Sequence, residues 1–334
     1  MPRKIVYFCP AIARPSGGVA VLLKQAMLLR EAGYEVSIHH LPVVGKAPDG
    51  KPQIEVFPTA WLDFSVQGLP FFPLGQGVIH LPLDADTLFV IPEGFGQLMR
   101  ETQRAPGKRL VFAQNWTYIL ESLPDAVSWR DYGIRHVLTV GQNIKRFIDT
   151  YMPGLEVGVV KYSINRAVFR PRHDKQPLIT YQCRNDYMQA KMGWVAKIFY
   201  LRNPHLRHYR FERLEGLSRK ALAGKLASSR VLLHTDEIAG MPTLPLEAMA
   251  CHTIPVGWRT YGGAEFMHEN NGFWVDNGDI TGLAEKLSEV VNLHEQGALD
   301  MARLAGGFEQ TLQEFTQEQE QRNTLAYFQR LLAD

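Results

Sequence analysis

Apolar and polar positions follow two different periods in the first forty residues. The run KIVYFC at residues 4–9 is continuously apolar after its lysine, which indicates a buried strand. From Val19 to Ala32 the apolar positions recur at intervals of three and four, which predicts a helix that Gly33 ends. A second strand-like run, EVSIHHL, comes next. This order predicts a β-α-β unit.

Similar runs continue along the chain. In the first half, strands are expected at 53–57, 86–91, 109–113 and 136–140, and helices at 94–104 and 142–151. In the second half, strands are expected at 178–183, 208–214, 230–235, 253–258 and 272–275, and helices at 188–200, 217–227, 245–251 and 280–293. Apolar strands separated by helices are typical of parallel sheets covered on both faces. Residues from about 298 to 332 are helical and rich in Gln and Glu, which predicts one packing helix or a pair.

The segment RAVFRPRHDKQP interrupts this alternation with two prolines and four basic side chains, which indicates a linker. We therefore expect an α/β protein with two doubly wound, Rossmann-like domains facing across a cleft. The expected parts are an amino-terminal domain over 1–165, the linker over 166–177, a carboxyl-terminal domain over 178–310 and a last helix over 311–334. One alternative returns that helix to the amino-terminal domain. Open α/β sheets bind ligands at the carboxyl ends of their strands, so the ligand is expected between the domains.

The composition narrows the class of protein. A chain of 334 residues with 46% apolar residues can form two cores. Its 36 basic and 34 acidic side chains give a net charge of +2, so nucleic acid is not an expected partner. The three cysteines lie far apart, which favours a reducing, cytoplasmic compartment. A secretory signal and a membrane span are not expected, because no apolar run approaches about 20 residues.

The sequence favours neither a metal site nor a dinucleotide cofactor. The eleven histidines form no HxH or HExxH pattern, and His39 and His40 would point to opposite faces of one strand. Gly17 and Gly18 form a single pair rather than GxGxxG, and no acidic residue ends the second strand, which argues against dinucleotide binding. These glycines either form a tight turn or let the backbone approach an anionic ligand at a helix start.

The stretch HTDEIAGMPTLPLEAMACHTIPVGW, residues 234–258, places a Gly/Pro loop between a strand and a short helix. Pro245 suits a first helical turn, and Glu247 is expected in that turn beside free backbone amides. Glu247 then has two interpretations. It either stabilises the helix dipole alone, by about 0.5 kcal/mol, or it accepts hydrogen bonds from the ribose hydroxyls of a nucleotide.

Here the chain resembles a known family. SRVLLHTDEIAGMPTLPLEAMACHTIPVG followed by YGGAEFMHENNGFWV is similar to the carboxyl-terminal signature of GT-B nucleotide-sugar glycosyltransferases, particularly retaining family 4. GGVAVLLKQAMLLREAGYEVSI and VVKYSINRAVFRP resemble its glycine loop with the first helix and its interdomain stretch. DTLFVIPEGFG and RLVFAQNWTYI look like a bacterial polysaccharide-type subset. The resemblance touches most of the chain and implies a GT-B fold, a nucleoside-diphosphate sugar as co-substrate and no metal ion.

The resemblance also implies roles for residues of the donor site. Arg184 and Lys191 would hold the diphosphate and stabilise it as the leaving group. Glu247 would hold the ribose, and Gly17 and Gly18 would face the transferred sugar. The other donor-binding candidates are Glu237 and Gly240, with Met241, Thr243 and Leu244 acting through backbone amides.

One spacing departs from the family. Its two glutamates stand eight positions apart, whereas here Ala239 stands eight positions before Glu247, and Glu237 stands ten before it. Either the loop carries two extra residues, or the role of the first glutamate is missing.

Acceptor-binding residues are expected in the amino-terminal domain. The candidates are Arg14, Gln114, Asn115, Trp116 and Tyr118. Core packing is the alternative for the two aromatic residues among them. An inverting reaction would need a general base, for which Glu93 is the first candidate. In a retaining reaction, which the resemblance favours, the departing phosphate oxygen takes the acceptor proton and no protein base is required.

We therefore expect a glycosyltransferase that moves a sugar from a nucleoside-diphosphate donor to a glycan or lipid-linked acceptor. The alternatives are a non-catalytic sugar- or nucleotide-binding protein of the same fold, and a nucleotide-sugar epimerase. The basic segment 202–225 is most simply a solvated face. It would also suit peripheral contact with anionic lipid at the inner face of a membrane.

Overall fold

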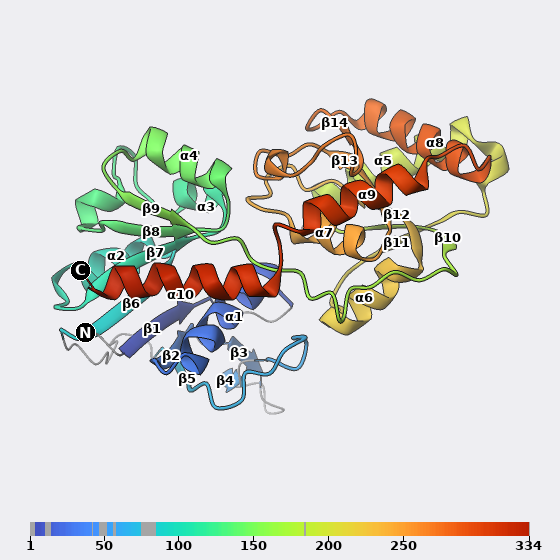
Figure 1. Ribbon diagram of the computed structural model, residues 1–334. Helices are drawn as coiled ribbons and strands as arrows, with labels where there is room; N and C mark the ends of the chain where they lie inside the picture. The colour runs from blue at the N-terminus through green and yellow to red at the C-terminus, as the bar shows by residue number, and fades with distance from the viewer. Residues whose placement is uncertain are drawn as a thin grey trace. The chain divides into compact units, whose positions relative to one another are not determined.

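The computed structural model describes residues 4–10, 15–41, 43–46, 52–55, 58–74, 85–183 and 185–333, with only the backbone course described for 43–46 and 52–55 (Figure 1). The chain forms two compact units. The amino-terminal unit comprises Met1–Tyr162 and Glu318–Asp334, and the carboxyl-terminal unit comprises Ser163–Gln317. Both are α/β units built on a parallel sheet, as the sequence predicts.

A seven-stranded sheet forms the centre of the amino-terminal unit. Its strands are β1 (Lys4–Cys9), β2 (Glu35–His40), β5 (Phe71–Pro73), β6 (Thr87–Pro92), β7 (Lys108–Ala113), β8 (His136–Thr139) and β9 (Glu156–Val159). They lie in the order β5-β2-β1-β6-β7-β8-β9, with parallel pairing throughout. The chain moves outward from β1 in both directions, and such a reversal opens a crevice at the carboxyl ends of the strands.

Helices connect these strands. They are α1 (Gly17–Glu31), α2 (Gly96–Glu101) with the 3-10 turn η1 (Thr102–Arg104), α3 (Trp116–Glu121), the 3-10 turn η2 (Trp129–Tyr132) and α4 (Gln142–Tyr151). All six residues of β6 are buried, which explains why this strand is a continuous apolar run in the sequence.

Residues 53–57 were expected to add a parallel strand, and this prediction is wrong. Strand β4 (Pro52–Glu55) pairs antiparallel with β3 (Val43–Lys46) in a separate two-stranded sheet. Parallel pairing needs a long crossover connection, and only five residues separate these two strands. The short strands β5 and β9 were not predicted, because three or four residues carry too little periodicity.

The carboxyl-terminal helical segment is a pair, α9 (Met301–Leu312) and α10 (Gln317–Ala333). Figure 1 shows α10 running across the strands of the amino-terminal sheet. Lys24 on α1 forms an ion pair with Glu320 at 2.8 Å, and the Tyr327 hydroxyl donates to the carbonyl of Val137 at 3.2 Å. Helix α10 therefore packs on the unit built from the first 162 residues.

The carboxyl-terminal unit contains a five-stranded parallel sheet in the order β11-β10-β12-β13-β14. Its strands are β10 (Gln176–Tyr181), β11 (Arg210–Arg213), β12 (Ser229–His234), β13 (Ile254–Trp258) and β14 (Phe273–Val275). Its helices are α5 (Asp186–Arg202), α6 (Arg219–Ser228), α7 (Thr243–Ala250), α8 (Ile280–Glu295) and α9, with the 3-10 turns η3 (Pro204–Leu206) and η4 (Gly263–Glu265).

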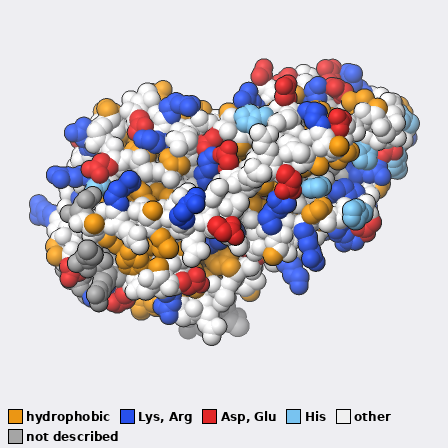
Figure 2. Space-filling model, in the orientation of Figure 1, with side chains coloured by type: hydrophobic (Ala, Val, Ile, Leu, Met, Phe, Trp, Pro, Cys, Tyr) orange, Lys and Arg blue, Asp and Glu red, His pale blue; other side chains and the backbone are white. Residues whose placement is uncertain are grey.

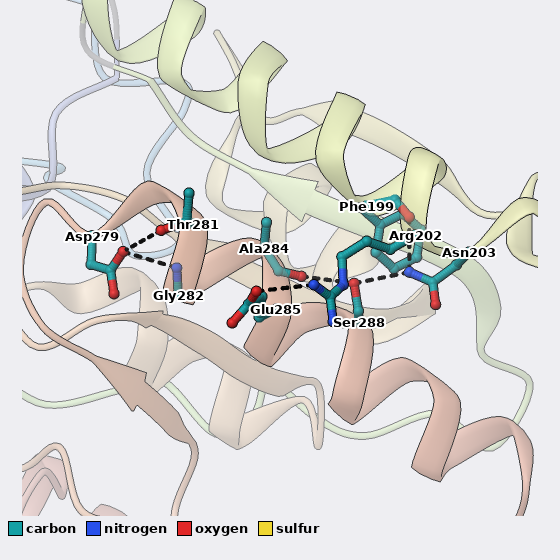
Figure 3. Close-up of polar contacts among 9 residues, drawn as sticks. All are labelled: Phe199, Arg202, Asn203, Asp279, Thr281, Gly282, Ala284, Glu285 and Ser288. Atoms are coloured by element: carbon teal, nitrogen blue, oxygen red, sulfur yellow. Dashed lines mark hydrogen bonds and ion pairs between the residues drawn. The ribbon is translucent and has the colours of Figure 1, made fainter.

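Helices α5 and α8 are joined by polar contacts between their facing sides (Figure 3). Asn203 donates to the Phe199 carbonyl at 2.8 Å and to the Ser288 hydroxyl at 2.9 Å, and both contacts are buried. Arg202 adds an exposed ion pair with Glu285 at 2.9 Å. The contacts with Ser288 and Glu285 therefore hold α5, the helix that carries Lys191, against α8.

Candidate active site

Three neighbouring strands of the carboxyl-terminal unit place their following loops at one edge of its sheet. β10, β12 and β13 are adjacent and parallel, so the loops after Tyr181, His234 and Trp258 all leave the sheet at its carboxyl end. Ligands of open α/β sheets bind at this edge. Apart from Gly17 and Gly18, the predicted donor residues belong to these loops and to the helices that follow them.

Lys191 and Glu237 form a charged pair at this edge. Their Nζ and Oε1 atoms are 2.6 Å apart, and the Lys191 side chain is 7% exposed. The ammonium lies 4.3 Å from the Tyr187 ring centre and 5.4 Å from that of Trp258. Burial by itself lowers the pKa of Lys191, but hydrogen bonds and charge interactions with Glu237 and Tyr187 outweigh it and raise the pKa. Lys191 is therefore a fixed positive charge.

The loop that carries Glu237 is anchored from a second side. The side-chain amide of Asn277, after β14, donates to the Glu237 carbonyl at 3.0 Å. A Cβ atom at Gly278 would lie 3.3 Å from Glu237 Oε1. Just before it, Thr235 is 2% exposed, and among the described residues its hydroxyl has no hydrogen-bond partner. The carboxylate is thus held in place, and an unused donor lies near it in sequence.

Two glycine backbones touch where the loops after β12 and β13 meet. A Cβ atom added to Gly262 would fall 1.5 Å from the carbonyl oxygen of Gly240 and 2.9 Å from that of Ala239. The next amide, that of Gly263, donates to the Thr260 hydroxyl at 3.1 Å. Ala239, which stands where the family has a glutamate, is 1% exposed and contributes backbone packing here.

Helix α7 begins at Thr243, two residues earlier than the sequence predicts. Pro242 occupies the capping position in an extended conformation and forms no side-chain cap. The amides of Thr243 and Leu244 begin the helix, where backbone N–H groups lack intrahelical acceptors. This helix start can receive an anion, because its amides and the helix dipole both favour negative charge.

Glu247 was expected in the first turn of this helix, and that prediction is wrong. It is the fifth helical residue, because the helix already starts at Thr243. Its side chain is 1% exposed, and Oε1 accepts a hydrogen bond from Arg219 Nη1 at 2.5 Å. The Arg219 guanidinium also lies over the Phe169 ring, 4.8 Å from its centre. Glu247 is therefore a buried carboxylate neutralised by an arginine from α6, rather than a first-turn carboxylate.

In the amino-terminal unit, four predicted residues gather at the carboxyl edge of the sheet. Gly17 and Gly18 are the first two residues of α1. The Gln114 side-chain amide, after β7, donates to the Gly18 carbonyl at 3.0 Å. Glu93, after β6, is 4% exposed, and its Oε1 accepts from the backbone amides of Gln114 at 3.0 Å and Asn115 at 2.8 Å. Burial raises the pKa of Glu93 to about 7, although backbone hydrogen bonds act in the opposite direction.

The other acceptor candidates have mixed surroundings. Asn115 caps α3, with its side-chain oxygen accepting from the amide of Thr117 at 3.0 Å. Trp116 packs against Phe147, with ring centres 5.8 Å apart, whereas Tyr118 is 40% exposed.

Two predicted residues, Arg14 and Arg184, lie outside the described residues. Sequence reasoning missed three others: Arg219, Thr235 and Gly262. The paired glycines of YGGAE gave a signal for Gly262. Nothing local marked Arg219, because its partner Glu247 lies 28 residues away.

Comparisons with known proteins agree with this architecture. Residues 211–301 match the family model described as glycosyl transferases group 1. Among curated proteins, none matches the chain in sequence. Among solved structures, sucrose-phosphate synthase (tll1590) from Thermosynechococcus elongatus is similar with a TM-score of 0.69 and 14% identity, covering 99% of each chain.

Two further structures were solved with nucleotide ligands. Anabaena HepE in complex with UDP-glucose has a TM-score of 0.69 and 11% identity, covering 98% of this chain and 99% of its own. The pneumococcal O-GlcNAc transferase GtfA in complex with UDP and GlcNAc has a TM-score of 0.62 and 9% identity, covering 99% and 98%. At these identities the likeness shows the fold, and the matched segment 211–301 contains the loops after β12 and β13 described above. The chain thus has the GT-B fold, and residues 211–301 of its carboxyl-terminal unit match the model of glycosyl transferases group 1.

Proposed function

We propose that the protein transfers a sugar from a nucleoside-diphosphate donor, held by its carboxyl-terminal unit, to a glycan or lipid-linked acceptor. The observation that carries this proposal is the Lys191–Glu237 pair, 2.6 Å apart, at the same sheet edge as the open start of α7. A buried, charged lysine and free helix amides together suit a diphosphate. HepE and GtfA bind UDP in their solved complexes, so UDP is the first nucleotide to test.

The diphosphate would bind between Lys191 and the amides of Thr243 and Leu244. Negative charge grows on this group as the bond between the donor's sugar and its phosphate breaks. Fixed positive charge stabilises the departing diphosphate. Arg184 would add a second cation. With this charge supplied by the chain, the reaction needs no divalent ion.

Glu237 and Glu247 would contact the two ends of the donor. Glu237 Oε1 is bonded to Lys191, so a bound diphosphate would compete for that ammonium and turn the carboxylate toward the sugar hydroxyls. Glu247 uses Oε1 for Arg219, which leaves Oε2 as the oxygen that would accept from ribose hydroxyls. Gly17 and Gly18 would face the transferred sugar. Retention follows if the acceptor hydroxyl attacks the anomeric carbon on the face from which the diphosphate leaves, and the departing phosphate oxygen then takes the acceptor proton.

A panel of UDP, GDP and TDP tests donor binding. The matching nucleotide is expected to raise the melting temperature by mass action, and both Glu247→Gln and Lys191→Ala should remove most of the shift. Glu247→Gln keeps an oxygen for Arg219, so it separates ligand contact from folding. Glu309→Gln is the control, since Glu309 pairs with Arg166 on exposed side chains. Unchanged melting with every nucleotide would contradict the proposal.

A non-catalytic binding protein is the second candidate, because Ala239 stands where the family has its first glutamate. A turnover assay distinguishes a glycosyltransferase from a non-catalytic binding protein. Transfer predicts that nucleoside diphosphate is released when donor and acceptor are both present, whereas a binding protein gives a melting shift without release. Conversion of the donor sugar with no acceptor present would indicate an epimerase instead.

Peripheral membrane contact through 202–225 is a further proposal, and ion pairs formed by this segment neutralise part of the charge that it would use. Four of the basic side chains in this segment form ion pairs: Arg202–Glu285, Arg213–Glu215, Arg219–Glu247 and Lys225–Glu212. Figure 2 shows basic and acidic side chains intermixed on the face it draws. No helix of the described residues has the length and apolarity that crossing a membrane requires. Flotation with vesicles containing anionic lipid would test the contact.

A further inference from the structure

Glu93 lies at the start of a chain of contacts that crosses three neighbouring strands of the amino-terminal sheet. Its Oε1 accepts from the amides of Gln114 and Asn115, at 3.0 and 2.8 Å, in the turn between β7 and α3. The Gln114 side chain then donates to the Gly18 carbonyl at the start of α1, at 3.0 Å. The Ser122 hydroxyl closes the far end of α3 by donating to the Glu93 carbonyl at 2.7 Å.

This geometry does not suit a general base. A base must come within hydrogen-bond reach of the proton that it removes. The Glu93 residue is 4% exposed, and one carboxylate oxygen already accepts two backbone amides. Both amides precede the first turn of α3, so the carboxylate acts on the backbone of its own unit.

The Gln114 side chain packs against the start of α1. A Cβ atom on Gly18 would lie 3.4 Å from Gln114 Oε1 and 3.6 Å from Nε2, so the side-chain amide lies flat against the glycine backbone. Its nitrogen is used by the Gly18 carbonyl. In the described part of the chain, no donor is bonded to its oxygen. Gln114 Nε2 is therefore held by the Gly18 carbonyl, and Oε1 can accept a hydrogen bond from a hydroxyl group.

We propose that Glu93 is a positioning residue that holds the β7–α3 turn, so that Gln114 stays bonded to Gly18 and presents its Oε1 to a hydroxyl of the acceptor. The inference rests on the proposed function for the identity of that substrate. It assigns Glu93 a role through Gln114 rather than a proton-transfer role. The absence of a side chain at Gly18 is what allows the amide to approach the helix start.

The test compares Glu93→Gln, Glu93→Ala and Gln114→Ala, with the exposed Glu101→Gln as the control. Glutamine keeps an oxygen that can accept both backbone amides but cannot act as a base at neutral pH. We expect Glu93→Gln to rescue at least a third of the wild-type kcat/KM for the acceptor. Glu93→Ala and Gln114→Ala should each lower it by at least 30-fold, with the donor KM within about twofold of wild type.

The double variant Glu93→Ala/Gln114→Ala is expected to be no worse than the poorer single variant, because both changes remove the same contact chain. Additive losses would overturn the proposal. So would a Glu93→Gln enzyme that still binds nucleotide but transfers no sugar, since that result identifies a base. A wild-type protein that transfers nothing would instead defeat the proposed function.

Amide hydrogen exchange tests the contact chain without any substrate. Peptides covering residues 113–117 should exchange at least tenfold faster in Glu93→Ala than in Glu93→Gln, and peptides covering 15–22 should loosen in both Glu93→Ala and Gln114→Ala. Equal exchange in wild type and Glu93→Ala would overturn the inference. If Glu93→Ala does not fold, the Glu93→Gln and Gln114→Ala comparisons still decide it.

Discussion

The guanidinium of Arg219 donates to Glu247 Oε1 at 2.5 Å, and the carboxylate it neutralises is 1% exposed. A carboxylate buried to this degree needs a partner, since taking an unpaired charge out of water costs several kcal/mol. The residue expected to hold a ribose is thus also a structural residue of α7. Variants at this pair must be judged by folding and by ligand binding together.

Arg219→Met should leave Glu247 buried and unpaired, and should lower the free energy of unfolding by about 3–5 kcal/mol. Urea denaturation measures this. Arg202→Met is the matched control, because its partner Glu285 is 59% exposed, and such surface pairs are worth about 0–1 kcal/mol. Equal losses of unfolding free energy in the two variants would show that the Arg219–Glu247 pair stabilises the protein no more than a surface pair does.

Gly262→Ala should destabilise the protein by about 1–3 kcal/mol, as insertion into a packed site does. The added Cβ would meet the Gly240 carbonyl oxygen at 1.5 Å, so the two loops must separate. Nucleotide affinity should fall as well, because the start of α7 follows Gly240. Gly224→Ala in α6 is the control: nothing lies within 4 Å of its Cβ position, so it should stabilise by about 0.5–1 kcal/mol. A wild-type melting curve for Gly262→Ala would refute the close contact.

Lys175→Met should lower the free energy of unfolding by about 2–4 kcal/mol, since buried polar groups left unsatisfied cost about 1–3 kcal/mol each. Lys175 Nζ lies 3.0–3.1 Å from four acceptors that share its three N–H donors: the carbonyls of Ala227, Ser229 and Cys251 and the Thr253 hydroxyl. It therefore joins the ends of α6 and α7. Lys145→Met, which removes a surface pair with Asp149, should cost under 1 kcal/mol. If Lys175→Met lowers the free energy of unfolding no more than Lys145→Met does, Lys175 does not stabilise the protein by joining α6 and α7.

Glu93 should make the stability fall as pH rises. Burial raises its pKa in the folded protein to about 7 from the ordinary 4.5, so between these values the folded state keeps a proton that the unfolded state has lost. Above pH 7 the free energy of unfolding has fallen by its full amount. A pKa shift from 4.5 to about 7, at roughly 1.4 kcal/mol per pKa unit, corresponds to about 2–4 kcal/mol. Comparing melting temperatures of wild type and Glu93→Gln from pH 4.5 to 8 measures it. Parallel curves would mean that the carboxyl titrates normally.

Much of the fold could be read from the chain because its determinants are local. Continuous apolar runs such as β6 indicate strands buried on both faces, and the three-four spacing of α1 indicates a covering helix. Glycine loops followed by helix starts marked the candidate site at Gly18 and at Gly240. Lys191 and Glu237 were selected through a family resemblance, and the structure brings them together in one ion pair.

The sequence by itself determined two parallel α/β sheets and the residue types at their carboxyl edges, since periodicity and turn chemistry act over a few residues. Tertiary structure decided the contacts that depend on distant segments. It paired Arg219 with Glu247, pressed Gly262 against Gly240, placed α10 on the amino-terminal unit, and turned Glu93 toward backbone amides. Each of these contacts joins segments far apart in the chain, and its geometry is fixed only when strand order and helix packing bring the two partners to the same edge.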